Sequence, residues 1–193
     1  FYIGYLLLCD TLDQADTEFG TRAARVLAHM RQNMLTVVDF VTESPQKFKT
    51  AVKAALPYID VLVINEIEAG NTFDLPVRQD DGRLNFDAMH RCGQAFIAAG
   101  IKTMAVFHYP EGAFVITADG KHHLFEACAL PKSKIVGTTG AGVPFCAGVL
   151  YGLHQNLPLA ETIQIANLSA KYNLLHPTAS GGAVKLEEML RHG

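Results

Sequence analysis

The sequence has no cluster of Lys and Arg residues, and its formal net charge is −3 over 193 residues. Without a basic block the chain lacks the electrostatic footprint for nucleic acid or an anionic membrane, so we expect neither as a partner. The longest apolar run, Phe1 to Cys9, is too short to span a bilayer. No basic segment precedes it as in a signal peptide. Because the chain opens inside a strand-like run, we expect further sequence upstream.

Paired cysteines are also missing. The four cysteines, Cys9, Cys92, Cys128 and Cys146, form no CxxC motif, and their spacing fits neither a zinc site nor a disulfide framework. The eight histidines form no HExxH or similar array. We therefore predict buried, reduced thiols in a cytoplasmic protein.

Short β-branched runs alternate with segments whose apolar residues recur at helical spacing. We expect strands at 1–8, 35–40, 60–65, 102–108, 113–118 and 124–130. We expect a first helix after a polar cap at 13–17, a second helix at 48–56, and a helix or turn at 66–70. A further helix should begin at the cap Asn85 and stop at Gly100, and three more should lie at 142–153, 159–175 and 184–191. This alternation predicts βαβ units, and hence one α/β domain over residues 1–193 with a mostly parallel sheet covered by helices on both faces.

A glycine-rich segment at residues 136–148, VGTTGAGVPFCAG, runs straight into an apolar helix. Free N–H groups and the dipole at a helix N-terminus form an anion site, and small residues let a phosphate approach the backbone. The alternative is a tight turn in which Gly148 serves helix packing, and we favour the anion site. No GK[ST] follows, so the segment is not a P-loop. No GxGxxG opens the first βα unit, which excludes the dinucleotide fingerprint.

The segment GTTGAGVPFCAGVLYGL resembles the signature of the ribokinase-like (PfkB) carbohydrate kinases, D-T-x-G-A-G-D-x-F-x-x-G. Other segments fall in the order that the family expects: Leu56-Pro57 and Asp60 before an N-x-x-E motif at 65–68, a glycine turn at 111–113, and a closing adenine-side segment at 167–182. The resemblance covers nearly the whole chain. It implies the C-terminal, nucleotide-binding part of a three-layer ribokinase-like fold, with the N-terminal portion and the lid missing.

In that family, the γ-phosphoryl group of ATP passes to a sugar hydroxymethyl group, which needs positioning, charge stabilisation and a base. By resemblance, the backbone N–H groups of Gly140, Ala141 and Gly142 would form the anion hole. Asn65 and Glu68 would bind Mg²⁺ through water near the phosphates, and helix capping is an equal alternative for both. The remaining ATP contacts implied by the resemblance are Gly112, Thr138, Asn167 and Gly182.

Val143 stands where the family carries its catalytic aspartate. Valine accepts no proton, and the loss of a general base typically costs on the order of 10² to 10⁴ in rate. Pro144 removes one N–H group from the anion-binding end and biases Val143 away from the helical region. Gly137 stands where many members of the family have an Asp of a monovalent-cation site. The segment 107–109 stands where the family commonly has a T-x-G motif, and we interpret His108 in this segment as a strand-end residue. We expect phosphoryl transfer to be very poor or absent.

Three hypotheses follow. The chain is a sugar kinase by descent that has lost its base, or a non-catalytic nucleotide- or metabolite-binding regulator, or, more weakly, a structural fragment with no ligand. The retained glycine turn and Asn65 and Glu68 favour nucleotide binding. Asp39, at a strand end, either contacts the sugar or is a turn residue, with equal weight. Unpaired strand edges would allow a homodimer.

Overall fold

The computed structural model describes residues 1–138 and 140–192. Six strands hydrogen-bond in the order β1-β4-β5-β6-β7-β8, and two short strands, β2 and β3, form a separate antiparallel pair. The chain divides into two compact units. Unit 1 comprises Phe1–Phe107 with Phe114–His123, and unit 2 comprises His108–Ala113 with Leu124–Gly193. The single domain expected over residues 1–193 stays a prediction.

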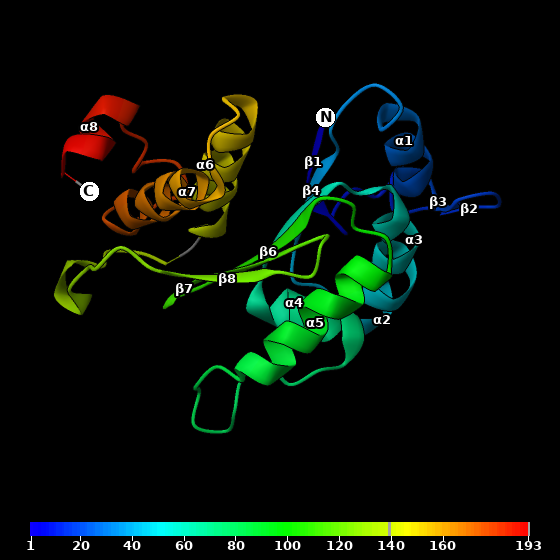
Figure 1. Ribbon diagram of the computed structural model, residues 1–193, viewed down its shortest axis with the longest axis horizontal. Coiled ribbons are helices and arrows are strands. Elements are labelled where there is room, and N and C mark those ends of the chain that lie inside the picture. The colour runs from blue at the N-terminus through cyan, green and yellow to red at the C-terminus, as the bar shows by residue number, and fades with distance from the viewer. Residues whose placement is uncertain (139, 193) are drawn as a thin grey trace. The chain divides into compact units, whose positions relative to one another are not determined.

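Most elements belong to unit 1 (Figure 1). Its strands and helices are β1 (Tyr2–Leu6), β2 (Ala15–Asp16), β3 (Gly20–Thr21), α1 (Arg22–Met30), β4 (Val37–Phe40), α2 (Pro45–Lys47), a π-helix (Phe48–Val52), α3 (Lys53–Ala55), a 3-10 helix (Leu56–Tyr58), β5 (Val61–Asn65), α4 (Glu66–Phe73) and α5 (Phe86–Ala98). Both units contribute residues to β6 (Met104–Tyr109), β7 (Gly112–Thr117) and β8 (His122–Glu126).

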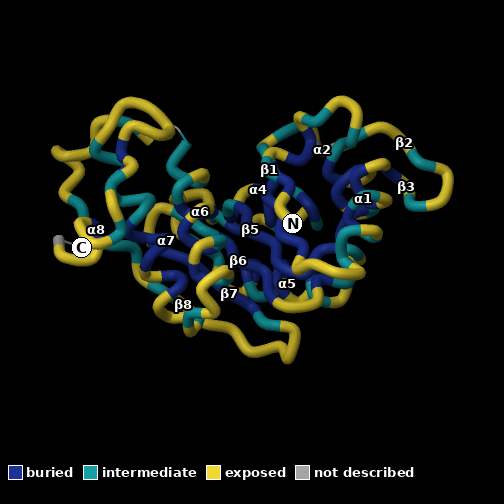
Figure 2. The backbone as a smooth tube through the Cα atoms, turned by 90° about the horizontal axis from the view of Figure 1, so that it is seen from above, coloured by how far each residue is buried: buried dark blue, intermediate teal, exposed yellow. Residues whose placement is uncertain are grey.

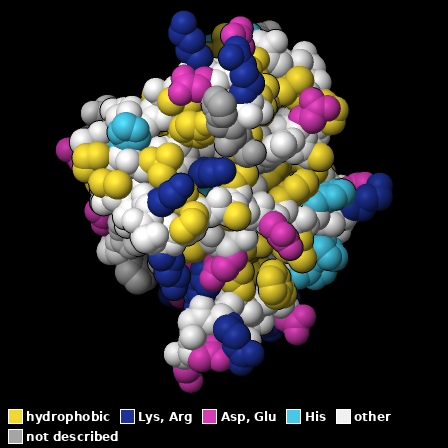
Figure 3. Space-filling model, turned by 90° about the vertical axis from the view of Figure 1, so that its left-hand side faces the viewer, with side chains coloured by type: hydrophobic (Ala, Val, Ile, Leu, Met, Phe, Trp, Pro, Cys, Tyr) yellow, Lys and Arg dark blue, Asp and Glu magenta, His cyan; other side chains and the backbone are white. Residues whose placement is uncertain are grey.

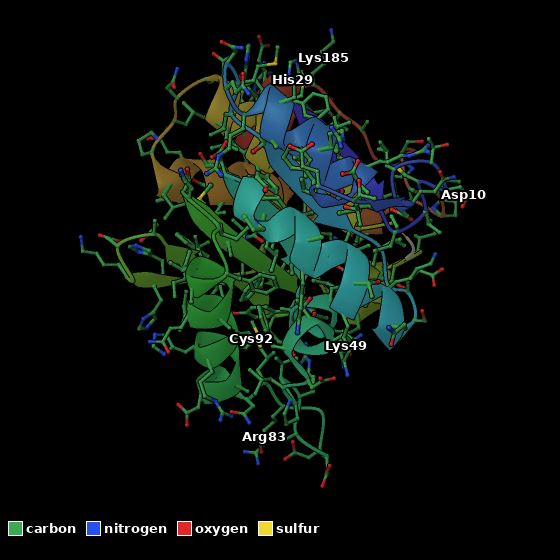
Figure 4. The ribbon with its side chains drawn as sticks, turned by 90° about the vertical axis from the view of Figure 1, so that its right-hand side faces the viewer. Asp10, His29, Lys49, Arg83, Cys92 and Lys185 are labelled. Atoms are coloured by element: carbon green, nitrogen blue, oxygen red, sulfur yellow. The ribbon has the colours of Figure 1, made fainter. Side chains whose placement is uncertain are left out.

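Strands β1, β4 and β5 are parallel neighbours, which confirms the prediction of a parallel sheet at this position. Val37 pairs with Tyr2 on one side and with Val61 on the other. Every residue of β4 is buried, as its β-branched sequence predicts for a strand covered on both faces. Right-handed crossovers between successive parallel strands place their helices on the same face, and Figure 4 shows α1, α2, α3 and α5 together in front of the strands.

The core of unit 1 contains a run of aromatic rings. Phe48, Phe96, Phe107 and Phe114 are fully buried. The ring centroids of Phe96 and Phe107 lie 5.5 Å apart, and those of Phe107 and Phe114 lie 5.8 Å apart in a stacked pair. In Figure 2, β5 and neighbouring parts of the sheet are dark blue and the loops are yellow. These ring contacts therefore join α5 to β6 and β6 to β7.

A buried polar cluster fixes the start of β5. Asp60 accepts hydrogen bonds from the Thr36 amide (2.8 Å) and the Thr36 hydroxyl (2.9 Å). It also pairs with the Arg31 guanidinium at 2.9 Å. Asp60 is thus a structural anchor that joins β5 to α1 and to the segment before β4.

The polar segment 13–17 does not cap a helix, so that expectation is wrong. Asp16 accepts hydrogen bonds from the amides of Glu18 and Phe19, each 2.9 Å long, and turns the chain between β2 and β3. The helix begins later, and its cap is Thr21, whose hydroxyl accepts from the Ala24 amide. A second boundary also differs: the strand expected at 124–130 is β8 and ends at Glu126.

Unit 2 contains a 3-10 helix (Lys132–Lys134) and the helices α6 (Gly142–His154), α7 (Leu159–Leu174) and α8 (Leu186–His192). Helices α6 and α7 pack closely, because a Cβ at Gly148 would lie 2.5 Å from the Ala166 Cα. This confirms the packing role considered for Gly148. Across residues 1–138 and 140–192, no helix is long and apolar enough to cross a membrane.

Candidate nucleotide site

The glycine-rich segment forms a turn that leads into α6. Gly140 has a φ of 75°, in the left-handed region that favours glycine. A Cβ there would also collide with the Cβ of Ala179. The turn is tightened by a hydrogen bond of 3.4 Å from the Ala141 amide to the Thr138 carbonyl, and another of 3.1 Å from the Val143 amide to the Gly140 carbonyl. The predicted turn-to-helix geometry is therefore present.

Val143 and Pro144 lie in the first turn of α6, which begins at Gly142. Proline is tolerated there because the N–H groups of the first turn have no intrahelical acceptor. Val143 is 36% exposed, and its side chain lines a cavity with Pro144. At this position the chain presents an apolar surface where an aspartate would present a proton acceptor.

The cavity has a volume of about 260 Å³ and lies wholly within unit 2. We refer to it as the α6–α8 cavity. Its walls come from α6, α7, the segment 179–184 and α8, and the lining residues are Val143, Pro144, Ala147, Ser169, Tyr172, Asn173, Ala179, Ser180, Gly182, Ala183, Val184 and Met189. The lining is mostly apolar with a few hydroxyl and amide groups, the usual character of a small-molecule site. Figure 3 shows one face of the molecule, on which hydrophobic side chains are exposed among charged ones.

Asn173 holds the wall of the cavity formed by the segment 179–184. Its side chain is 2% exposed. With its amide nitrogen facing the loop, Asn173 donates hydrogen bonds to the carbonyls of Ala179 (2.8 Å) and Thr178 (3.2 Å). Gly182 lies against the end of α7, since a Cβ there would be 2.5 Å from the Asn173 Cα. The predicted residue Gly182 thus belongs to the cavity wall.

The other predicted ATP contacts of unit 2 have structural roles. Asn167 is 8% exposed, and its amide nitrogen donates to the Glu126 carbonyl at 3.1 Å, which ties α7 to the end of β8. A Cβ at Gly112 would collide with the Phe125 carbonyl oxygen. Neither residue lines the α6–α8 cavity. Their contact with a nucleotide, like that of Thr138, stays a prediction.

In unit 1, Asn65 and Glu68 form a reciprocal capping box at the start of α4. The Glu68 amide donates to the Asn65 side-chain oxygen at 2.8 Å, and the Asn65 amide donates to the Glu68 carboxylate at 3.0 Å. The Thr42 hydroxyl donates to the other carboxylate oxygen at 3.0 Å. The capping alternative is therefore present in the structure, whereas magnesium binding stays a prediction.

Burial raises the pKa of the Glu68 carboxyl to about 7, because desolvation outweighs its hydrogen bonds with Asn65 and Thr42. The nearby charge of Asp39 acts in the same direction. A cation beside Glu68 would favour the ionised form and reverse this shift. Oxygen atoms are the ligands that Mg²⁺ prefers. Among the described residues no three His, Cys, Asp or Glu side chains converge on a metal position, so a cation would need water or phosphate oxygens as well.

Asp39 lies in β4 and is 9% exposed. The Tyr2 hydroxyl donates to one carboxylate oxygen at 2.5 Å, and the Tyr5 amide donates to the other. The carboxylate thus joins β4 to β1. Its contact with a sugar stays a prediction.

Most residues that line the α6–α8 cavity lie in the two segments that the sequence singled out, 136–148 and 167–182. Ser169, Tyr172 and Asn173 share one face of α7 at spacings of three and four residues, but sequence reasoning named none of them individually. Ala183, Val184 and Met189 lie outside both segments, and no local pattern indicated that they would reach the cavity.

Comparison with known proteins identifies relatives. Residues 5–185 match the model described as pfkB family carbohydrate kinase. Adenosine kinase from Saccharomyces cerevisiae is 29% identical over 132 residues, which are 67% of this chain and 37% of that protein. Ribokinase from Lactococcus lactis is 36% identical over 58 residues, or 30% of this chain and 19% of that protein. The chain therefore aligns with well under half of either relative.

Solved structures agree in fold. Adenosine kinase from Anopheles gambiae, in complex with P1,P4-di(adenosine-5) tetraphosphate, matches with a TM-score of 0.71 at 20% identity, over 90% of this chain and 50% of that one. Aminoimidazole riboside kinase from Salmonella enterica, complexed with aminoimidazole riboside and an ATP analogue, matches with a TM-score of 0.72 at 17% identity, over 99% of this chain and 61% of that one. These matches confirm the predicted ribokinase-like α/β fold with a mostly parallel sheet.

The family model covers far more than half of the chain, and it spans both the capping box at the start of α4 and the glycine turn at the start of α6. The sequence resemblance, the topology and the matched residues agree with one another. This chain belongs to the pfkB family of carbohydrate kinases.

Proposed function

We propose that this chain binds ATP in unit 2 and belongs to an ATP-dependent kinase that phosphorylates a carbohydrate hydroxymethyl group only slowly. One observation carries the proposal: the glycine turn at the start of α6 and the α6–α8 cavity share Val143 and Pro144. A helix N-terminus suits the phosphates, and an adjacent apolar cavity suits a heteroaromatic base. The relatives named as adenosine kinase and aminoimidazole riboside kinase suggest ribosides among the acceptors to be tested.

The expected chemistry follows from the residues in the first turn of α6. The dipole and N–H groups at its N-terminus would stabilise charge on the transferred phosphoryl group. Pro144 contributes no N–H group to that end. Val143 takes no proton from the acceptor hydroxyl, so that proton would pass to solvent. The rate would then lack the general-base contribution, which is on the order of 10² to 10⁴.

Magnesium would be held through Asn65 and Glu68. Mg²⁺, when bound, supplies positive charge that favours phosphoryl transfer. Glu68 fits this role in chemistry, since it is a buried carboxyl whose proton a cation would displace. Asn65 positions Glu68 through the capping box. A cytoplasmic location and a homodimer also remain predictions.

Calorimetry with a non-hydrolysable ATP analogue, followed by a coupled ATP assay, tests the proposal. We expect the wild-type protein to bind the analogue and to turn over sugars and ribosides very slowly. V143D would restore a carboxylate at the base position and raise kcat by on the order of 10² to 10⁴. A folded sample that gives no binding heat would exclude ATP binding, and equal rates for the two proteins would show that Val143 does not limit transfer.

A second candidate is a non-catalytic regulator that binds a nucleotide or metabolite. The observation in its favour is that Val143 and Pro144 both contribute to the apolar lining of the α6–α8 cavity. In that case V143D would bind the ATP analogue as the wild type does, yet show no gain in turnover. The same two measurements therefore separate the two candidates.

A further inference from the structure

Two histidine rings from different elements meet beside α5. His90 lies in α5 and His122 is the first residue of β8, and both residues belong to unit 1. Their ring centroids lie 4.9 Å apart, and the ring planes are inclined at 64° to each other. Strand β8 stands last in the strand order of the sheet, next to β7. The histidine pair therefore connects the outermost strand on this side with the helix that covers its neighbour.

Close packing fixes the positions of both histidines. A Cβ at Gly93, one helical turn after His90, would lie 2.9 Å from the Ile116 Cγ2 and 3.2 Å from the Phe114 Cε1, so α5 lies directly on β7. The His122 ring is stacked on Phe114, which is fully buried, with the centroids 5.8 Å apart and the planes 11° from parallel. A helix and a stacked ring thus hold the two imidazoles in place before any ligand arrives.

The pair is accessible from solvent, because His122 is exposed and His90 is only half-buried. Each neutral imidazole has a nitrogen lone pair, and histidine is the commonest metal ligand in proteins. The nearest charge in sequence belongs to Lys121, whose ammonium group pairs with the Asp119 carboxylate at 2.6 Å. That positive charge is therefore balanced locally and does not exclude a cation from the two rings.

The distance between the rings agrees with a shared metal ion. When two imidazoles bind one ion through bonds of about 2 Å at an angle of about 90–110°, their centroids lie about 4.5–5.2 Å apart. The 4.9 Å between His90 and His122 falls inside that range. An ion can therefore bind both rings without separating α5 from β8.

We propose that His90 and His122 bind a divalent transition-metal ion, Zn²⁺ or Cu²⁺, which joins β8 to α5. Imidazole nitrogen suits both ions. Within residues 1–138 and 140–192, no three His, Cys, Asp or Glu side chains converge on one metal position, so water would complete the coordination. The pair uses none of the residues proposed for ATP or Mg²⁺, and the inference goes beyond the proposed function without depending on it.

The contrasting explanation is that the two rings only pack against each other, since edge-to-face aromatic pairs cover a similar range of distances. Rings that only pack would give the protein no affinity for a metal ion. A third possibility is binding by the adjacent residues His122 and His123. These two residues lie on opposite faces of β8, because successive residues of a strand alternate. Separate substitutions of the three histidines distinguish these explanations.

The experiment measures the calorimetric affinity of the whole chain for Zn²⁺ in the absence of nucleotide. H90Q and H122Q each keep a polar side chain and remove one imidazole ligand. H123Q is the matched control, because His123 is an exposed histidine in the same strand. Circular dichroism shows that each variant is folded. A second measurement needs no variant: pulsed electron paramagnetic resonance of the wild type with one equivalent of Cu²⁺ counts the imidazoles bound to the ion.

We expect the wild type and H123Q to bind one Zn²⁺ with equal affinity. H90Q and H122Q should each bind Zn²⁺ at least about tenfold more weakly, because the loss of an outer-shell partner alone typically costs about 10- to 100-fold. Two imidazoles on Cu²⁺ would support the proposal. It is wrong if the wild type binds no Zn²⁺, if H90Q binds as the wild type does, or if H123Q is weakened as much as H122Q. If a variant does not fold, the Cu²⁺ spectrum decides, and one imidazole or none would overturn the proposal.

Discussion

Replacing Glu68 with glutamine should change how stability depends on pH. Glu68 is 4% exposed, and its carboxylate accepts from the Asn65 amide and the Thr42 hydroxyl. Glutamine keeps an acceptor at this position of the capping box but does not ionise. The comparison of E68Q with the wild type therefore isolates the ionisation of one carboxyl group.

The magnitude follows from the pKa of Glu68, which burial raises from 4.5 to about 7. This difference corresponds to about 3 kcal/mol, because one pH unit is worth about 1.4 kcal/mol. The folded state holds the proton more tightly than the unfolded state. The contribution is fully present below pH 4.5 and is lost as the pH rises to 7.

Urea unfolding of both proteins at a series of pH values between 4.5 and 8 provides the assay. We expect the unfolding free energy of the wild type, taken relative to E68Q, to fall by about 3 kcal/mol across that range. His108 has a pKa lowered to about 4 and acts in the opposite direction, but it is common to both proteins and cancels. A constant difference between the proteins would refute the reasoning. If Mg²⁺ binds at Glu68, its addition above pH 7 should stabilise the wild type and not E68Q.

Three further substitutions test the packing and hydrogen bonds described above. G148A places a Cβ 2.5 Å from the Ala166 Cα and should destabilise the protein by about 1–3 kcal/mol in urea unfolding; an unchanged midpoint would show that α6 and α7 can separate freely. Y2F removes the donor to Asp39 and should cost about 1 kcal/mol in the same assay, so a gain in stability would contradict the bond. G140A forces a side chain into a left-handed turn against Ala179 and should weaken the binding of the ATP analogue measured by calorimetry. An unaltered affinity would show that the turn is not part of the nucleotide site.

The elements with strong periodicity were predictable from the sequence. The β-branched run of β4 and the cap Asn85 of α5 lie where the pattern places them, and Asn85 accepts from the Ala88 amide at 3.1 Å. The failure at 13–17 has a physical cause. The carboxylate of Asp16 can accept a hydrogen bond from a nearby backbone amide either at the start of a helix or in a turn, so its presence does not decide between the two. Gly20, with a φ of 84°, permits the hairpin.

The candidate site was only partly predictable. The glycine turn is a local pattern, so its position and its entry into α6 followed from the sequence. The cavity beside it depends on side chains that meet only after α7 and α8 pack, such as Tyr172 and Met189. His108 lies at a strand end as predicted, but its Cε1 would lie only 3.0 Å from a Cβ at Gly142, because distant segments pack together. No spacing in the sequence could indicate that contact.

The glycine seam between α6 and α7 limits how this site can diversify. Gly148 meets Ala166, and Gly152 in the same way leaves no room for a side chain beside Thr162. Larger residues in the seam would push the helices apart. New ligand preferences can therefore arise more readily in the segment 179–184 and in α8, which form the opposite walls. The α6 and α7 walls of the cavity are therefore held in place by the seam, whereas the seam places no such constraint on the other walls.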